Sequence, residues 1–135
     1  MTKILANTDF ALHIADFENS LLEQHWPNKE ERMTEDDYKE EMKNYLKFVT
    51  TYKFRRALIN TRDFNFIIKP DVQQWVDTKI ATEASKIIHA IAFVIPTDAF
   101  AEASIRQVMM ERNAMYVNIE FFDDLEQARQ WLLTK

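Results

Sequence analysis

The stretch IIHAIAFVI, residues 87–95, is nearly all apolar and rich in β-branched side chains. Such a run, ended here by Pro96, is typical of a strand that is buried on both faces. Strands of that kind belong to parallel sheets that helices cover on each side. His89 is the one ionisable side chain in the run, and we expect it to be buried, neutral and hydrogen-bonded to a neighbour. The stretch therefore predicts an α/β fold.

The segments on either side of this run alternate between strand and helix patterns. Alternating or short apolar runs predict further strands over residues 10–15, 20–26, 56–60 and 116–122. Helical spacing and capping residues predict helices that begin at Thr34, at Pro70, at Thr97 or Asp98, and near Asp123. The complete pattern predicts an α/β fold with a mostly parallel sheet of roughly 4–5 strands, an N-terminal antiparallel hairpin and about four helices.

The composition excludes several kinds of chemistry. The 135 residues include no cysteine, which excludes disulfides, thiolate metal sites and cysteine nucleophiles. They include no glycine, which excludes P-loop and Rossmann phosphate cradles, so turns are expected to rely on Asn, Asp and Pro. A net charge of −5 disfavours binding to nucleic acid, and the apolar runs fall far short of the roughly 20 residues that span a membrane. With no signal-peptide pattern at the N-terminus, we expect one cytoplasmic domain over residues 1–135, without cofactor or metal.

Several segments carry a resemblance to a known family. They are LINTRDF at residues 58–64, a helix that bears Trp75, AFVIP at residues 92–96 and FFDDLEQARQWL at residues 121–132. With an acidic helix after a strand that ends at Trp26, this pattern resembles the small bacterial STAS/CRAL-TRIO-like proteins of the SpoIIAA-like type. The resemblance spans nearly the whole chain. It implies a STAS-like sheet covered by helices, and a role in protein regulation or in binding an apolar ligand.

One departure from the family pattern concerns phosphorylation. Anti-sigma-factor antagonists of this type carry a phosphoacceptor Ser or Thr where a helix starts after the third strand, usually preceded by Asp and followed by Gly. The corresponding stretch here is NTRD, residues 60–63, which has neither serine nor glycine. Thr61 is the nearest hydroxyl, and it is therefore the candidate for an antagonist-like phospho-switch.

The connection Asn60–Asp71 is the most informative segment for function. It follows a predicted parallel strand, which is where α/β folds place ligands. Its apolar run is unusual for a loop and either forms the lip of a hydrophobic pocket or fills the core beneath the loop. Arg62 either holds an anion or pairs with Asp63, Asp71 or a helix end. The candidate binding residues, including one from the next helix, are Thr61, Arg62, Asp63, Phe64, Phe66 and Trp75.

Three functions are compatible with these observations. The first is a non-catalytic regulatory or binding module that contacts a protein partner or a small apolar molecule near residues 60–71. The second is the phospho-switch on Thr61. The third is an enzyme that uses Arg62, Asp63 and His89, which is disfavoured because no catalytic base with a neighbouring partner is evident. His13 and His25 are not expected to share a metal ion, and a homodimer through the loop or the hairpin edge stays open.

Overall fold

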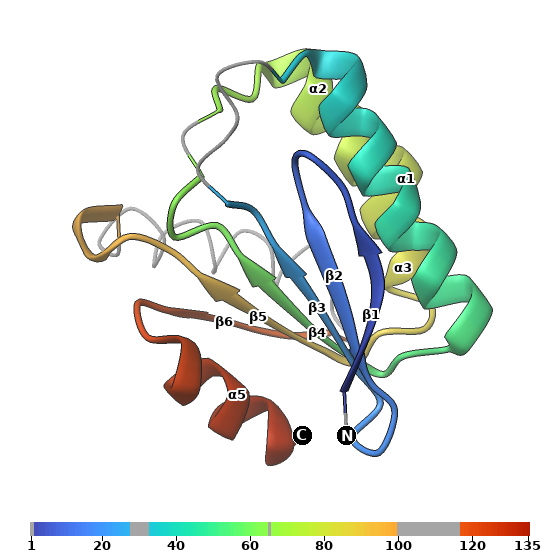
Figure 1. The fold of residues 1–135 in the computed structure, drawn as a ribbon, viewed down its shortest axis with the longest axis vertical. Coiled ribbons are helices and arrows are strands. Elements are labelled where there is room, and N and C mark those ends of the chain that lie inside the picture. Colours follow the sequence, from blue (N-terminus) through green and yellow to red (C-terminus); the bar gives the residue numbers. More distant parts are fainter. Residues whose placement is uncertain (1, 28–32, 65, 100–116) are drawn as a thin grey trace.

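A computed structural model describes residues 2–27, 33–64, 66–99 and 117–135 of the chain. Within these ranges six strands form one sheet in the order β1-β2-β3-β4-β5-β6. The strands are β1 (Thr2–Asn7), β2 (Leu12–Asp16), β3 (Leu21–His25), β4 (Arg56–Asn60), β5 (Ala90–Val94) and β6 (Asn118–Phe122). The pairs β1–β2 and β2–β3 are antiparallel, and β3, β4, β5 and β6 run parallel to one another (Figure 1). The predicted fold class, with its N-terminal antiparallel hairpin, is confirmed.

The edge strand β1 is the element that the sequence does not predict. It pairs antiparallel with β2 and has a bulge between Ile4 and Ala6. Ile4 is 58% exposed. A short edge strand with so much exposed surface needs no regular apolar alternation, because only part of it touches the core. The sheet therefore has one strand more than the largest number expected.

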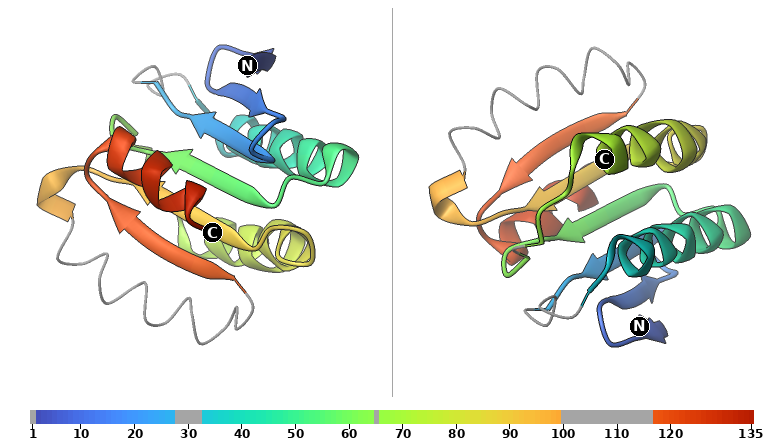
Figure 2. Two further views of the ribbon diagram at one scale, coloured as in Figure 1. Left: turned by 90° about the horizontal axis from the view of Figure 1, so that it is seen from below. Right: turned by 90° about the horizontal axis from the view of Figure 1, so that it is seen from above.

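Helices cover both faces of the sheet. Helix α1 (Glu35–Tyr52) lies on one face beside a second helical segment, which consists of α2 (Pro70–Trp75), the π-helical η2 (Val76–Ala81) and α3 (Thr82–Ala84). Helix α5 (Leu125–Leu133) lies on the opposite face (Figure 2). The helix predicted from Thr97 or Asp98 begins as a 3-10 turn, η3 (Thr97–Ala99), and its remainder lies outside the described residues, as does Tyr116.

The sequence has two pairs of adjacent acids, at positions 36–37 and 123–124, and their places at helix starts predict that they cap helices. At the start of α1, Thr34 and Asp37 form a reciprocal capping box in which each side chain accepts from the other residue's backbone N–H. At α5 the cap is Asp124, which accepts from the N–H of Gln127 at 3.1 Å. The capping role is confirmed, although at α5 it falls one residue after the Asp123 that the sequence predicts.

Tight turns without glycine use residues other than those expected. Among the described residues, Ser20 and Lys53 have positive φ values, 50° and 58°. Lys53 ends α1 in the left-handed conformation that glycine usually supplies, and its N–H donates to the carbonyl of Val49. The carbonyl of Ser20 accepts from the N–H groups of Arg55 and Arg56, which fixes the hairpin turn against the start of β4. The expectation that Asn, Asp and Pro would make the turns is wrong for these two positive-φ positions. In the hairpin turn, however, Asp16 accepts hydrogen bonds from the N–H and the side-chain amide of Asn19, as expected for a turn built on Asp and Asn.

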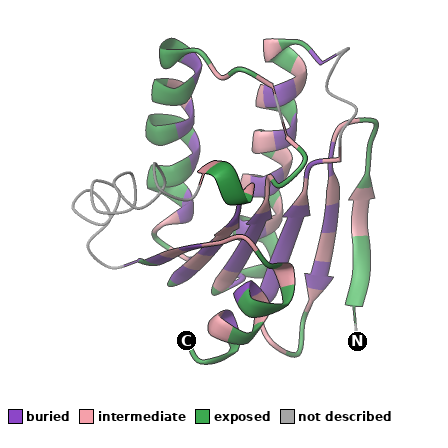
Figure 3. Ribbon diagram, turned by 90° about the vertical axis from the view of Figure 1, so that its left-hand side faces the viewer, coloured by how far each residue is buried: buried purple, intermediate pink, exposed green. Residues whose placement is uncertain are grey.

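Two apolar layers follow from the alternation of side chains along each strand. Figure 3 shows the buried residues concentrated along the sheet and on the helix faces turned toward it. The layer under α1 and η2 includes Leu22, Trp26, Tyr45, Val49, Ala57 and Ile59. The layer under α5 is formed by Leu21, Leu58, Ala90, Ala92, Val94, Ala128 and Leu132.

Residues 87–95 supply the expected inner strand of the parallel sheet, with one correction. Strand β5 lies between β4 and β6 and is parallel to both, and its Ala92 and Val94 are fully buried. His89 is exposed and precedes the strand, with its N–H donating to the carbonyl of Arg55 at 2.8 Å. The expectation of a buried His89 is therefore wrong, because β5 begins at Ala90, three residues after the start of the predicted strand.

One residue in the acidic run at the start of α1 is buried instead of facing water. We expect Glu35–Glu41 to face water, but Glu41 is only 4% exposed. Its carboxylate accepts hydrogen bonds from the Thr8 hydroxyl and from Asn44 Nδ2. Glu41 therefore ties the β1–β2 connection to α1 instead of solvating the helix.

A second buried polar group lies on strand β2. The alternation over residues 10–15 predicts a half-buried strand, and its side under α1 carries Ala11, His13 and Ala15. Gln24 links His13 to Trp26: the indole N–H of Trp26 donates to Gln24 Oε1 at 3.0 Å, so Gln24 Nε2 points at His13 Nε2, 3.1 Å away. Because an amide NH₂ only donates, His13 accepts through Nε2 and carries its proton on Nδ1.

Burial, and to a smaller extent the nearby His25, lowers the pKa of His13 from 6.5 to about 4. We therefore predict that His13 stays neutral to about pH 4 in the form protonated on Nδ1. Because this folded-state pKa lies below the ordinary value of 6.5, the stability that neutral His13 contributes is complete above pH 6.5 and is lost as the pH falls toward 4.

Long-range ¹H–¹⁵N NMR spectra of the His13 imidazole over this pH range test the prediction. Protonation of His13 near pH 6.5, or a proton on Nε2 at neutral pH, would contradict it.

Candidate functional site

The parallel strands β3, β4, β5 and β6 all end at one edge of the sheet, where α/β folds usually place binding residues. His25 and Asn60 close β3 and β4 there, and Thr61 follows directly. Thr61 is held twice by the carbonyl of Val94 on β5, since its N–H donates at 2.8 Å and its hydroxyl at 3.0 Å. The start of the Asn60–Asp71 connection is therefore fixed to the neighbouring strand.

A chain of hydrogen bonds runs from α5 to this edge, on the α5 side of the sheet. Arg129 donates to both oxygens of Glu23, at 2.8 and 2.9 Å. Glu23 Oε1 lies 2.8 Å from His25 Nε2, and His25 Nδ1 lies 2.9 Å from Asn60 Nδ2. The backbone N–H of Arg62 then donates to Asn60 Oδ1 at 3.1 Å.

The hydrogen bond from Arg62 fixes which groups donate and which accept along this chain. Since Asn60 Oδ1 accepts from Arg62, Asn60 Nδ2 faces His25 and donates to Nδ1. His25 therefore donates through Nε2 to Glu23. Burial alone would raise the pKa of Glu23, but the hydrogen bonds from His25 and Arg129 outweigh burial and lower that pKa to about 2. The hydrogen bond to Glu23 raises the pKa of Arg129.

Sequence reasoning did not identify Glu23, His25 and Arg129 as a connected group. The available signal was weak: Glu23 is an acid in a predicted strand, next to Leu21 and Leu22. It is 7% exposed in the structure. A buried carboxylate needs a partner, but Arg129 is 106 positions away along the chain, so only the packing of α5 on the sheet reveals it.

The apolar side chains of the connection pack on one another. Phe64 lies edge-on to Trp26, with ring centroids 5.1 Å apart, and Phe66 stacks on Tyr38 at 5.8 Å. Phe64 also contacts Tyr38 and Phe66, at 6.0 and 6.1 Å. We call Trp26, Tyr38, Phe64 and Phe66 the aromatic cluster. Of the two interpretations that the sequence allows, this packing agrees with rings that fill the core beneath the loop.

Several residues of the connection are exposed, and three of them lie next to or near the packed rings along the chain. Arg62 and Asp63 are exposed, and Ile67 is 82% exposed, the largest fraction among the exposed large apolar side chains of the described residues. Neither Arg62 nor Asp63 forms an ion pair with another residue that the structure describes, so the expected pairing of Arg62 with Asp63 or Asp71 is wrong. We call Arg62, Asp63 and Ile67 the Arg62 surface.

Trp75 takes a different position from the other candidates. It is half-buried on α2, and the ammonium of Lys39 from α1 lies 5.3 Å from the centre of its ring. This cation–π contact joins α1 to α2. Trp75 is not in ring contact with the aromatic cluster among the described residues.

The histidines do not form a catalytic or metal-binding group with these residues. His89 precedes β5, whereas Arg62 follows the parallel strand β4, so they lie at opposite ends of strands about 16 Å long. His13 and His25 are on opposite faces of the sheet, as the bonding of each shows. Among the residues that the structure describes, no three His, Asp or Glu side chains are placed to hold a metal ion.

The comparison with protein families identifies the class of domain. A model of the SpoIIAA-like family matches residues 29–133. The chain belongs to the SpoIIAA-like family. It therefore carries a STAS-type regulatory domain, and domains of this family are generally non-catalytic. The CRAL-TRIO-like part of the resemblance stays a prediction.

No curated protein and no solved structure shows significant similarity to the chain. In the described part of this SpoIIAA-like chain, none of the helices is long and apolar enough to cross a membrane.

Replacing Phe64 with alanine tests whether the aromatic cluster is core. We predict that Phe64→Ala lowers the free energy of unfolding by about 2–3 kcal/mol, because the ring packs against Trp26, Tyr38 and Phe66. Ile67→Ala serves as the matched control and should change it by less than about 0.5 kcal/mol. Urea unfolding of both variants measures the difference, and equal effects of the two changes would count against a packed cluster.

A second prediction concerns how the ionised carboxylate of Glu23 contributes to stability at different pH values. Glu23→Gln should lower the free energy of unfolding at pH 7 by about 1–3 kcal/mol, since the hydrogen bonds to the charged group are weakened. The folded-state pKa of about 2 lies below the ordinary value of 4.5, so this contribution is complete above pH 4.5 and is lost as the pH falls toward 2. Denaturant unfolding at several pH values should show the wild type and the variant converging over that range. A constant difference would contradict the assigned charge.

Proposed function

We propose that this SpoIIAA-like chain is a non-catalytic, cytoplasmic regulatory module that binds a protein partner through the Arg62 surface. One observation carries the proposal: Arg62, Asp63 and Ile67 are exposed within six consecutive positions of a loop whose Phe64 and Phe66 pack on Trp26 and Tyr38. A guanidinium beside an exposed apolar side chain is a combination that protein interfaces favour.

The contacts that hold the described residues of the loop support binding through this surface. Its first residue, Thr61, is held by Val94, and the N–H of Arg62 is held by Asn60. Phe64 packs on Trp26, and Phe66 packs on Tyr38. A surface that is already ordered loses little conformational entropy when it binds, so more of the contact energy appears as affinity.

A protein partner is favoured over a small apolar ligand. The rings of Phe64 and Phe66 contact each other and Tyr38, so they occupy the space that an apolar pocket beneath the loop would need. The apolar side chain that remains available, Ile67, projects from the surface. A single projecting side chain is suited to fill a pocket on a partner.

The alternative phospho-switch on Thr61 has weaker support. The Thr61 hydroxyl is half-buried and donates to the carbonyl of Val94. Phosphorylation would remove this donor and place a negative charge beside a carbonyl oxygen. The next helix starts at Pro70, nine positions later, so Thr61 is not at a helix N-terminus that could stabilise a phosphate.

Site-specific photo-crosslinking in the source cell tests the proposal. The photoreactive residue p-benzoylphenylalanine replaces Ile67 in one protein and Tyr52, which is 45% exposed at the end of α1, in a control. We expect a defined protein adduct from position 67 and none from position 52. Arg62→Glu should reduce the yield of that adduct by about tenfold, as loss of a hot-spot side chain would, whereas Lys47→Glu on the exposed side of α1 should leave it unchanged.

Three results would overturn the proposal. They are equal adducts from positions 52 and 67, an adduct that Arg62→Glu does not reduce, and native mass spectra in which a small apolar molecule accompanies the purified chain while no protein adduct forms. Circular dichroism of each variant verifies that the fold is retained.

A further inference from the structure

Among the residues that the structure describes, α5 covers only part of the width of its face of the sheet. Helix α5 packs on β4, β5 and β6, and β1 and β2 continue the same face beside it (Figures 1 and 3). The side chains at this boundary remain open to solvent: Ile4 of β1 is 58% exposed and Leu133 of α5 is 47% exposed. An apolar surface at the centre of a layered fold is normally covered by another element.

A hollow of about 380 Å³ lies between α5 and the β1–β2 edge. Ile14 and Leu21 form its apolar floor, and Leu133 lines it from the helix. In the register of β1 and β2, Ile4 is directly opposite Ile14 and extends the same apolar strip to the edge. We call this hollow, together with Ile4, the α5 groove.

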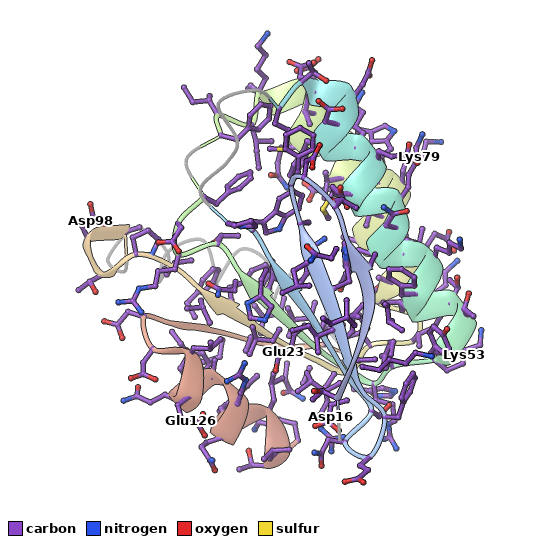
Figure 4. All side chains as sticks on the ribbon, viewed as in Figure 1. Asp16, Glu23, Lys53, Lys79, Asp98 and Glu126 are labelled. Atoms are coloured by element: carbon purple, nitrogen blue, oxygen red, sulfur yellow. The ribbon has the colours of Figure 1, made fainter. Side chains whose placement is uncertain are left out.

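The polar residues that line the groove give it a negative charge. Figure 4 labels Asp16, Glu23 and Glu126, which lie on β2, β3 and α5 respectively. Arg129 balances Glu23 through two hydrogen bonds. Among the described residues, Asp16 accepts from the N–H and the side-chain amide of Asn19, and Glu126, whose side chain is 69% exposed, lies 3.8 Å from Arg129. The lining thus holds three carboxylates and one guanidinium, which leaves an excess of negative charge.

The dimensions of the uncovered surface fit one helix. Neighbouring strands are about 4.8 Å apart, so β1 and β2 together present a strip roughly 10 Å wide. A helix packed on a sheet or beside another helix needs about the same width. A helix in this position would lie next to α5 and complete the second layer.

We propose that the α5 groove binds an amphipathic helix of a partner protein. Its apolar side would cover Ile4, Ile14 and Leu133, and its lysine or arginine side chains would face Asp16 and Glu126. The negative charge of the groove favours such a basic helix over a second copy of this chain, whose net charge is −5 and whose groove would present the same carboxylates. The α5 groove is separate from the Arg62 surface, so the two proposals stand or fall independently.

NMR titration of the ¹⁵N-labelled full chain with a designed peptide tests the proposal. The probe is a helix of about 18 residues, or roughly five turns, made only of leucine and lysine with the leucines on one side. We expect it to shift the amide signals of Ile14, Gln130 and Leu133. A peptide of the same composition with scrambled order, and one with glutamate in place of lysine, should bind at least about tenfold more weakly.

Matched variants assign the binding to the groove. Ile4→Lys and Glu126→Lys should each weaken binding by about tenfold, because they place a positive charge where the peptide's leucines or lysines bind. Tyr52→Lys and Glu83→Lys make comparable changes at exposed positions outside both proposed surfaces and should alter the dissociation constant less than about twofold.

The proposal is overturned if the scrambled peptide binds equally well, if the shifts map to residues outside the groove, or if no shift occurs at about 1 mM peptide. It is also overturned if sedimentation shows a dimer of the wild-type chain that Ile4→Lys dissociates, since the occupant would then be a second copy.

Discussion

Strand β3 buries two consecutive polar side chains, Glu23 and Gln24, and the arrangement of both layers depends on how they are satisfied. Because neighbouring residues of a strand face opposite sides, Glu23 needs partners in the α5 layer and Gln24 in the α1 layer. Glu23 finds them in Arg129 and His25. Gln24 bonds His13 and Trp26. A shift of β3 by one residue would exchange these faces and leave both groups buried without partners, so the register of β3 is strongly specified.

Both hydrogen-bonded groups reach the loop that we propose as the binding surface. On the α5 side, the chain from Glu23 passes through His25 and Asn60 to the N–H of Arg62. On the α1 side, Trp26 bonds Gln24 and also contacts Phe64. The loop is therefore held from two sides by the strand that organises the core. This connection explains how an exposed apolar residue such as Ile67 can be presented on an ordered segment.

The sequence was informative wherever a local pattern matched a local structure. The apolar run ending at Ile95, the capping box of Thr34 and Asp37, and the position of the Asn60–Asp71 connection could all be predicted. Features that depend on distant partners could not. Strand β1 is defined by pairing with β2, Glu41 is buried by its contact with Thr8, and Arg129 meets Glu23 only once α5 has packed. The Asn60–Asp71 connection was predicted as the binding segment. Which of its side chains pack in the aromatic cluster and which form the Arg62 surface became clear only from the tertiary structure.

The claim that β3 organises both layers depends on the strength of the hydrogen-bonded ion pair between Glu23 and Arg129. A double-mutant cycle of Glu23→Gln and Arg129→Met, followed by urea unfolding at pH 7, measures it most directly. We expect a coupling free energy of about 1–3 kcal/mol, as for hydrogen bonds between charged groups, here with Glu23 buried and the Arg129 side chain 37% exposed. If the two changes are additive within about 0.3 kcal/mol, the pair contributes nothing specific and the account is contradicted.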